Sequence, residues 1–518
     1  MGYTRSKQDQ IRDARINMKD FAEYCFGFTN TPFQIKWYDT MQDQSIKSGL
    51  IIAPRNSAKS TCWGKVAPLW LLGKYPDLRI VIVSRTSALA KTDMRFIRFN
   101  IESNDRVKEV FPAQKIGSRI YGLEEAAPWG EDALSVKNNR HDGVPSVYAV
   151  GLGGSISGIR ADIIIVDDLI DQNNVMTESQ RNKIDEFWDT VVLPTLNPGG
   201  RIFAVGTRYH AKDFYSRLLE DEMYKDSTFT FPALELNDDH KDLNDYKLGE
   251  DGEPISYWPE RWSVEELMKM KERMGSLAFN SQYMCDPSGY AGQLFDPEDI
   301  QFYKPEHLMA IWGDLDFVMS VDPNITADPE SDNTAIITAA IDRKRGSVYV
   351  TDIFAKPLDF VKQVHQIEKY GKKTQLSIGS HLFVPEARIS KIGVEAVAYQ
   401  RSLQQTGYLM GLPVVEVKQG NRNKEVRILG MQPHIENGRV RFPDPSTVKV
   451  PWWEDFLLEY STFPKGRRDD RMDALEILVT MVSGTFGVSG IPWGPGQGEQ
   501  PRRLKNIRDW SPDFARAR

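Results

Sequence analysis

The chain has 518 residues, of which 41% are hydrophobic and 26% are charged. This composition excludes a disordered or fibrous chain and predicts a globular protein of roughly two to four domains. Three scattered cysteines predict neither a disulfide framework nor a zinc site, and no apolar run reaches the ~18 residues of a membrane span. The net charge of −7 does not indicate a nucleic-acid binder, but it is compatible with DNA contact at a local basic face.

The first half of the chain alternates apolar segments with helical patterns, which predicts an α/β fold. A helix is expected at 86–101, a surface loop at 236–254, and a helix at 262–275 that begins with a capping box of Ser263 and Glu266. The apolar segments are expected to be buried strands of a mostly parallel sheet, at 50–54, 78–84, 161–168 and 200–207.

The second half repeats the alternation after a segment at 285–305 that is rich in Gly, Pro and Asp, which we interpret as a linker. A hairpin turn is expected at 342–346 and a helix at 358–372. Strands are expected at 317–322, 334–342, 347–355, 391–397 and 412–418. Together, the two halves predict two α/β domains.

A candidate nucleotide site follows the first predicted strand. The segment 53–60, APRNSAKS, has the spacing of the phosphate-binding pattern G-x-x-x-x-G-K-[ST], but Ala53 and Ala58 replace both glycines. Lys59 would reach the β- and γ-phosphates of ATP, and Ser60 would hold Mg²⁺. Alanine fits such a loop only where φ is negative or modestly strained. Considered without its surroundings, this octapeptide is better explained as a basic surface turn.

The third predicted strand ends in Asp167 and Asp168, which supports the nucleotide site. Asp167 would coordinate Mg²⁺ through water, and Asp168 would polarise the attacking water. Most ATPases of this kind have Glu at the second position, so Asp171 is a second candidate for the base. The alternative is an ordinary sheet edge, but the combination with Lys59 favours an ATPase.

Three further residues are candidates for the same site. Gln34 lies among aromatic residues before the first strand and could read the adenine edge, but considered alone it is better explained as a solvent-facing residue of an amphipathic helix. Arg160 could stabilise transferred phosphate in a neighbouring subunit, or form a salt bridge to Asp162. Thr207 ends the fourth strand, where its hydroxyl could sense phosphate, or it is simply a β-branched strand residue.

A second candidate site consists of carboxylates from separate segments. Asp322 and Glu395 end predicted strands, while Asp470 and Asp473 share one face of a helix expected to begin near Asp469. If the strands are neighbours, these acids converge at one sheet edge, where two divalent ions would offset their repulsion and activate water against a phosphodiester. Oxygen ligands favour Mg²⁺ or Mn²⁺. Each acid alone is weak evidence, because acids are common at strand ends and those of 469–473 could simply favour the helix macrodipole. Asp332 is a possible further ligand, but it is expected to be a loop residue.

Six segments together give the chain a family resemblance: PFQ, PRNSAKS, GIRADIIIVDD, VGTRYH, NSQYMCDPS and RRDDRMDAL, in this order. Over roughly residues 20–485, the chain resembles the large subunit of the DNA-packaging terminase of tailed bacteriophages. The resemblance implies a P-loop ATPase domain (21–284) of the RecA/ASCE type with a mostly parallel sheet, and an RNase H/RuvC-like nuclease domain (306–485). An N-terminal extension (1–20), a linker (285–305) and a flexible basic tail (486–518) complete the expected organisation.

The resemblance also implies roles for single residues. Arg55 corresponds to an arginine common in this family's phosphate loop, and Arg160 to a trans-acting finger. Asp322, Glu395 and Asp470 correspond to the nuclease triad, with Asp469 and Asp473 as neighbouring metal ligands. The expected nucleotide-binding residues are Gln34, Arg55, Asn56, Ser57, Ala58, Lys59, Ser60, Thr61, Asp167 and Thr207.

The resemblance further implies double-stranded DNA, the portal protein and a small terminase subunit as partners. It implies a homo-oligomeric ring on the procapsid in the host cytoplasm, at the portal vertex, with no membrane role and no place in the mature virion. DNA contacts are expected near the basic segments 343–346, 418–427 and 465–468. Two alternatives stay open, namely a helicase-like repair nuclease and an ATPase-inactive assembly adaptor.

Overall fold

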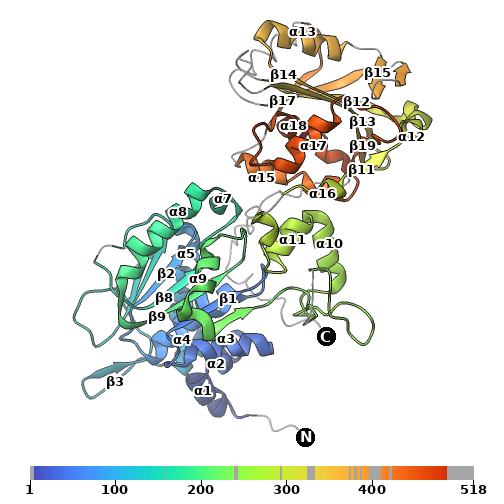
Figure 1. Cartoon of the computed structure of the whole chain (residues 1–518). Coiled ribbons are helices and arrows are strands. Elements are labelled where there is room, and N and C mark those ends of the chain that lie inside the picture. The colour runs from blue at the N-terminus through green and yellow to red at the C-terminus, as the bar shows by residue number, and fades with distance from the viewer. Residues whose placement is uncertain are drawn as a thin grey trace. The chain divides into compact units, whose positions relative to one another are not determined.

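The computed structural model of the chain consists of two compact units, which are described separately. Of the described residues, the first unit comprises 5–268 and 278–288, and the second comprises 269–277 and 289–486 (Figure 1). No helix of the described part is both long and apolar enough to cross a membrane. The structure describes residues 5–156, 158–237, 243–291, 294–323, 333–372, 375–378, 382–385, 388–395, 410–418 and 423–486.

The first unit is organised around an eight-stranded sheet in which the four predicted strands are neighbours. The strands from β10 to β7 are parallel, whereas β6 and β5 add an antiparallel edge. In sheet order, they are β10 (Thr228–Thr230), β1 (Ser48–Ile52), β9 (Leu196–Gly206), β8 (Ala161–Asp167), β2 (Ile80–Ser84), β7 (Val147–Gly151), β6 (Ala133–Val136) and β5 (Glu125–Trp129). The predicted α/β class with a mostly parallel sheet is confirmed.

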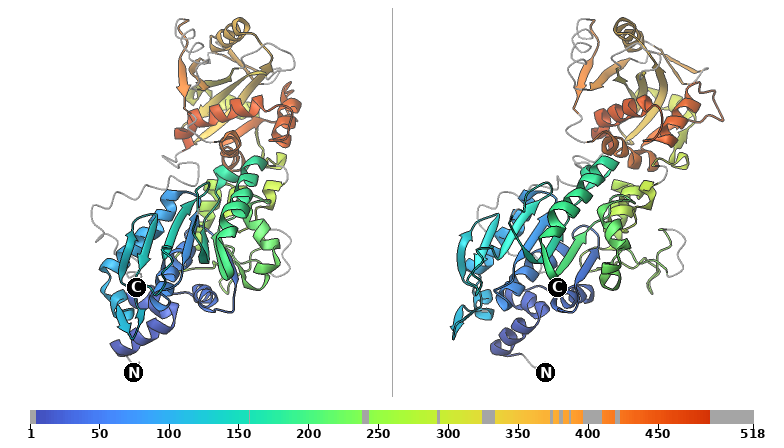
Figure 2. Two further views of the ribbon diagram at one scale, coloured as in Figure 1. Left: turned by 90° about the vertical axis from the view of Figure 1, so that its left-hand side faces the viewer. Right: turned by 60° about the vertical axis from the view of Figure 1, so that its left-hand side comes forward.

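Both faces of this sheet are covered, which explains why its central strands are continuous apolar runs (Figure 2). On one face, Ile51, Ile82 and Ile165 join a core with α1 to α6. On the other, Tyr215 of α9 packs directly on Gly206, where any side chain would collide with its ring. The helices are α1 (Lys7–Ile16), α2 (Met18–Phe26), α3 (Pro32–Gln42), α4 (Ala67–Lys74), α5 (Ser87–Ser103), α6 (Asp105–Val110), α7 (Gln172–Val175), α8 (Glu178–Phe187) and α9 (Phe214–Glu220).

The remaining elements of the first half include a hairpin of β3 (Gln114–Ile116) and β4 (Arg119–Tyr121). The chain passes between the units within α10 (Val264–Met274), within α11 (Ser276–Gln282) and again after Ser288. The expected capping box of α10 is present, because the Glu266 amide donates to Ser263 Oγ at 3.3 Å and the Ser263 amide donates to Glu266 Oε2 at 3.1 Å.

The second unit has a seven-stranded mixed sheet. Strands β12, β13 and β14 are antiparallel neighbours, and β17 and β18 continue from β12 in parallel. In sheet order, they are β11 (Gln301–Tyr303), β19 (Val440–Pro443), β14 (Ser347–Lys356), β13 (Thr334–Asp342), β12 (Asp316–Asp322), β17 (Ile389–Glu395) and β18 (Val414–Val417). A separate pair, β15 (Gln375–Ile378) and β16 (Leu382–Pro385), is antiparallel.

Helices α13 and α18 cover opposite faces of this sheet (Figure 1). Met319 and Val321 pack with Ile367 and Tyr370 of α13, whereas Ser320 points to the other face and donates to the Ala474 carbonyl of α18 at 2.7 Å. The helices are α12 (Pro305–Ala310), α13 (Phe360–Gly371), α15 (Lys424–Leu429), α16 (Gln432–Glu436), α17 (Trp453–Thr462) and α18 (Asp470–Val482).

Several strands were not expected from the sequence. Strands β5, β6, β7 and β10 extend the first sheet, and β11 and β19 extend the second. Strand β11 lies within the interval 285–305 interpreted as a linker, where it pairs with β19 through Gln301–Arg441 and Tyr303–Pro443. Asp332 and the basic tail beyond residue 486 lie outside the described residues.

Candidate functional site: a phosphate loop and a carboxylate edge

The candidate nucleotide site lies at the carboxyl ends of three adjacent parallel strands. The phosphate loop follows β1, Asp168 follows β8, and Thr207 follows β9. Lys59 is buried, and its Nζ donates to Thr207 Oγ1 at 2.9 Å and to the Pro54 carbonyl at 3.4 Å. The same Nζ lies 3.6 Å from Asp168 Oδ1. The structure therefore brings together residues that are about 150 positions apart in sequence, as the strand pattern predicted.

The loop backbone shows both conditions under which alanine can replace the glycines. Ala58 has φ of +66°, and Asn56 has φ of +59°. A left-handed conformation costs an L-residue other than Asn or Asp roughly 1–2 kcal/mol, so Ala58 keeps the conformation of the missing glycine at an energetic cost. Ala53 has a negative φ and is fully buried, so the first glycine position needs no glycine. Asp168 also has a positive φ, +46°.

The two alanines should respond in opposite ways to glycine. Ala58→Gly relieves the left-handed strain and should raise the free energy of unfolding by about 1 kcal/mol. Ala53→Gly removes a buried methyl group and increases chain entropy in the unfolded state, so it should lower that energy by about 1 kcal/mol. Urea titration of both variants measures the difference. Equal effects of the two changes would contradict the backbone assignment.

Asp167 ends β8 and is deeply buried. Its Oδ1 has no hydrogen-bond partner among the described residues. Burial, and then the charge of Asp168, raises the pKa of Asp167 to about 6, although a hydrogen bond from Ser60 opposes the shift. Ser57 Oγ is likewise buried without a partner in the described part. The buried carboxylates lack compensating positive charge, which a divalent cation would supply. The loop amides and the unpaired Ser57 hydroxyl are suited to bind a nucleotide phosphate.

A third acid, Asp93 of α5, belongs to this cluster and was missed in the sequence. Its Oδ1 lies 3.7 Å from Lys65 Nζ, and burial, followed by the charge of Asp167, raises the pKa of Asp93 well above its usual range. Both carboxylates approach Gly64, at 3.5 Å from the place of a Cβ atom. The only signal in the sequence was an acid on the apolar face of an amphipathic helix, between Ala90, Met94 and Ile97.

Asp167 should reduce the stability of the metal-free protein at neutral pH. Because its folded pKa is raised, folding favours the protonated form, and stability is lost as pH rises from about 4 to about 6. Asp167→Asn should therefore raise the free energy of unfolding at pH 7 by as much as about 3 kcal/mol. The gain should vanish near pH 4, as urea titrations at both pH values would show. A variant that is destabilised at pH 7 would contradict the burial of an ionised Asp167.

The other candidates for this site have defined contacts. Arg55 Nε donates to Tyr209 Oη at 3.1 Å, and Thr61 lies in the first turn of η1 (Ser60–Val66). Gln34 is buried and not solvent-facing, since its Oε1 accepts from the Thr31 amide at 2.9 Å in a capping box. Its role toward adenine stays a prediction.

The two remaining alternatives are also clarified by contacts. Arg160 is exposed and donates to the Pro194 carbonyl at 3.0 Å, while Asp162 pairs with Arg79 at 2.8 Å, so the suggested pair of Arg160 with Asp162 is absent. Asp171, the second candidate for the base, caps α7 and accepts a hydrogen bond from Arg85 Nη1 at 2.7 Å. Its carboxylate is therefore already engaged in these contacts.

The carboxylate edge lies in the second unit. The last paired residues of β12 and β17 are Val321 and Val394, so Asp322 and Glu395 follow them at the same edge. Helix α18 begins at Asp470, whose Oδ2 accepts from Asn333 Nδ2 at 2.8 Å. The bond from Ser320 to α18 fixes this helix against β12. Neighbouring parallel strands and the anchored helix thus explain how acids far apart in sequence converge.

The charges at this edge interact strongly. Burial, followed by the charges of Asp473 and Asp470, raises the pKa of Asp322 well above its usual range. Burial raises the pKa of Asp473 to about 7, although Lys424 opposes the shift. Lys424 Nζ lies 2.6 Å from Asp473 Oδ2 and 2.8 Å from Asp469 Oδ2. Lys424 therefore neutralises part of the negative charge of these carboxylates, which divalent ions were expected to neutralise.

The side chains do not form a preassembled metal site. Within the described ranges, no three Asp, Glu, His or Cys residues are arranged closely enough to hold one ion. The donor groups still suit a hard cation, because they are carboxylates. The raised pKa of Asp322 also indicates that positive charge is lacking around it.

Five cations of two predicted basic segments, 343–346 and 418–427, are paired with acids. Arg343, Lys344 and Arg345 pair with Asp316, Asp314 and Asp342, respectively. Lys424 pairs with acids as described, and Arg427 pairs with Glu476 at 3.1 Å. Residues 419–422 lie outside the described residues. These contacts weaken the expectation that 343–346 and 424–427 contact DNA.

The fold and the two groups of residues define a class: an α/β unit with a candidate phosphate loop, joined in one chain to a mixed α/β unit with a carboxylate edge. Residues 319–481 match the family model described as the terminase RNase H-like domain. The large terminase subunit of Enterobacteria phage T3 is 27% identical over 313 residues, which cover 55% of this chain and 50% of that protein. The chain thus spans about half the length of the curated relative that it matches.

Solved structures of similar proteins include the large terminases of a thermophilic bacteriophage and of bacteriophage HK97. The protein of the thermophilic phage is 11% identical, with 88% of this chain and 100% of that chain covered and a TM-score of 0.44. The HK97 protein is 12% identical, with 92% and 100% covered and a TM-score of 0.34. The resemblance to large terminase subunits of phages is therefore confirmed by the family model and the phage T3 relative.

Proposed function

We propose that the chain is the large subunit of a phage DNA-packaging terminase. In this role, it hydrolyses ATP to move double-stranded DNA into a procapsid, and it cuts concatemeric DNA with a divalent metal. The observation that carries the proposal is the contact of Lys59 with Thr207 and Asp168 at the ends of three parallel strands. Such a lysine at a strand-to-helix loop is suited to bind the phosphates of ATP.

The ATPase residues have separable tasks. Lys59 neutralises the β- and γ-phosphates, and the amides of Asn56, Ser57 and Ala58, with Arg55 and Thr61, surround them. Ser60 and Asp167 would hold Mg²⁺, which when bound offsets phosphate charge. Asp168 is better placed than Asp171 to orient water, since its carboxylate is 42% exposed and beside Lys59. Thr207 would transmit loss of phosphate through Lys59, Gln34 would contact adenine, and Arg160 would act on a neighbouring subunit's nucleotide.

The nuclease residues would act at the carboxylate edge. Asp322, Glu395 and Asp470 would serve together as ligands of two Mg²⁺ or Mn²⁺ ions, with Asp469 and Asp473 beside them. These ions, when bound, position water and stabilise the leaving oxygen of a phosphodiester. Asn333 fixes the orientation of Asp470 through its amide. Lys424 keeps Asp469 and Asp473 charge-compensated while no ion is bound.

The proposed partners are double-stranded DNA, a portal protein and a small terminase subunit. The chain would assemble as a homo-oligomeric ring at the portal vertex, in the host cytoplasm. The domain roles proposed are an ATPase at 21–284 and a nuclease at 306–485, connected by 285–305, with extensions at 1–20 and 486–518.

A DNA-dependent ATPase assay tests this function. The full-length chain should hydrolyse ATP faster when linear duplex DNA is added, and it should not separate the strands of a forked substrate. Strand separation would favour a helicase-like repair nuclease. No hydrolysis by an oligomeric preparation with duplex DNA present would favour an assembly adaptor, for which the strained Ala58 is the supporting observation.

A further inference from the structure

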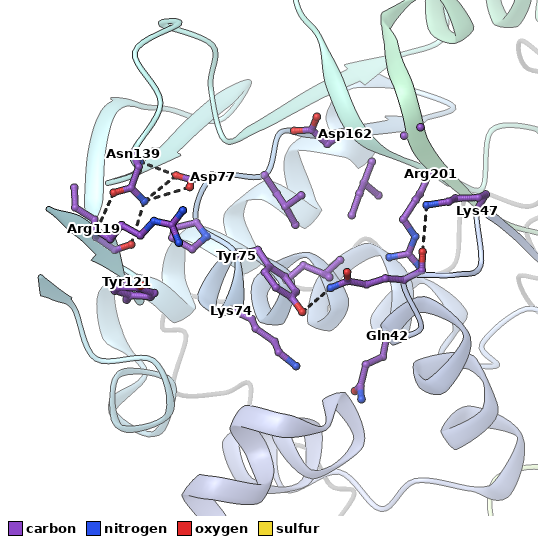
Figure 3. A pocket seen from close by; sticks show the side chains of 18 of the residues that line it. Gln42, Lys47, Lys74, Tyr75, Asp77, Arg119, Tyr121, Asn139, Asp162 and Arg201 are labelled. Atoms are coloured by element: carbon purple, nitrogen blue, oxygen red, sulfur yellow. Dashed lines mark hydrogen bonds between the residues drawn. The ribbon is translucent and has the colours of Figure 1, made fainter. Parts of the chain in front are cut away.

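The first unit contains a cavity of about 520 Å³ that none of the proposed ATPase residues lines (Figure 3). It lies at the amino ends of β2, β8 and β9, next to the end of α4 and the β3–β4 hairpin. Lys59, Asp168 and Thr207 are at the carboxyl ends of the same sheet. Strand β8 alone, with seven residues, separates the two edges by about 20 Å.

Cationic side chains outnumber carboxylates in the lining of this cavity. Lys47, Lys74, Arg119 and Arg201 face two acids, Asp77 and Asp162. Asp162 is already neutralised by Arg79, which does not line the cavity, through bonds of 2.8 and 2.9 Å. Asp77 accepts from the Asn139 amide at 2.6 Å. The cavity is thus positive in a chain whose net charge is −7.

None of the four cations forms an ion pair with a carboxylate among the described residues, but Lys47 and Arg201 donate to backbone carbonyls, which leaves Lys74 and Arg119 as the candidates to bind an anion. Lys74 Nζ lies 4.4 Å from the centre of the Trp70 ring, and burial lowers its pKa. Arg119 is exposed on the hairpin. A partly buried lysine without a counter-ion is electrostatically costly, so an anion bound here would be favoured.

Aromatic side chains accompany the cations. Tyr75 lies centrally in the cavity wall, where its hydroxyl accepts from Gln44 Nε2 at 2.6 Å, and Tyr121 lies on the hairpin side with Arg119 (Figure 3). Arg201 is held rigidly, because it donates to the carbonyls of Ile46, Met41 and Asp43 at 2.7–2.8 Å. Flat aromatic faces next to cations are the combination that binds stacked bases and their phosphates.

We propose that this cavity binds a nucleoside phosphate, with Lys74 and Arg119 on the phosphate and Tyr75 or Tyr121 against the base. Its volume is in the range of small-ligand sites. The nucleoside phosphate is either a unit of a nucleic-acid strand or a free nucleotide. Binding of a nucleic-acid strand rests on the proposed function, whereas binding of a nucleoside phosphate follows from the chemistry of the cavity alone.

The test uses fluorescence anisotropy of a labelled single-stranded dodecamer with the full-length chain. All proteins carry Lys59→Met, so that nucleotide binding at the phosphate loop does not contribute to the signal. Lys74→Met/Arg119→Gln removes two cations while keeping much of each apolar stem. The control, Lys183→Met/Lys225→Gln, removes two exposed cations of the same unit and changes net charge equally.

The cavity variant should bind the dodecamer on the order of tenfold more weakly than the control, and its slope of log affinity against log salt should be shallower by about 1.4. Arg119→Gln alone, on an exposed hairpin that tolerates the change, should lose part of the affinity. Equal affinity and salt slope for the cavity variant and the control would overturn the proposal.

Competition then separates the two sources. Displacement of the dodecamer by dAMP from the Lys59→Met protein, but not from the cavity variant, assigns a free nucleotide. A cavity-dependent loss of dodecamer binding without dAMP displacement assigns a strand. A wild-type chain without ATPase activity would contradict the proposed function and would leave this binding difference unchanged.

Discussion

Lys59→Met is expected to lower the ATP turnover of the full-length chain by at least about 10²–10³-fold, equivalent to about 2.7–4 kcal/mol of transition-state stabilisation. The reason is that Lys59 Nζ is the buried cation that joins the phosphate loop to Thr207 and Asp168. Methionine keeps the length and the apolar stem but removes the charge. Steady-state phosphate release with duplex DNA measures the effect.

The matched control is Lys183→Met, at an exposed lysine of α8 in the same unit. It should hydrolyse ATP at the rate of the unmodified chain. DNA cleavage by Lys59→Met should persist, because the carboxylate edge is in the other unit. Hydrolysis by Lys59→Met at the unmodified rate would refute the phosphate-loop assignment.

Asp322→Asn is expected to reduce metal-dependent cleavage of duplex DNA by more than about 100-fold, since changes even to groups that only support metal ligands cost about 10–100-fold. Asp322 ends β12 at the position where the charges of Asp473 and Asp470 accumulate. The amide has the same shape but no negative charge for a cation. Conversion of supercoiled plasmid with Mn²⁺ or Mg²⁺ measures the loss.

Asp316→Asn is the control for this change, because Asp316 begins the same strand and lies about 20 Å away at the opposite sheet edge. It pairs with Arg343 in an exposed position, so its loss should leave cleavage and ATP hydrolysis unchanged. A plasmid cut equally fast by Asp322→Asn and Asp316→Asn would show that the acids at this edge are not the nuclease centre.

The central strands were predictable because burial on both faces leaves continuous apolar runs. β8 and β13 have the predicted segments almost unchanged, and Asp167 and Asp322 end their strands as expected. Strand β5 was not predictable, because most of its residues are exposed and its pairing with β6 has an irregular register. Its pattern therefore lacks the apolar alternation that distinguishes a strand from a loop.

The local chemistry of the sites was less predictable than their location. Motif spacing cannot reveal that Ala58 adopts a left-handed conformation, because the loop contacts decide its φ. Nor can it reveal that Asp93 faces Asp167 across Gly64, since that contact joins a helix to a strand 74 positions later. The bond between Lys424 and Asp473 likewise depends on how α15 packs against α18.

A manganese titration of the metal-free full-length chain, followed by electron paramagnetic resonance without nucleotide, tests the central claim most directly. If the acids of β12, β17 and α18 form a metal site, the unmodified chain should bind about two more ions than Asp322→Asn. Identical manganese binding by both proteins would contradict the account of the carboxylate edge.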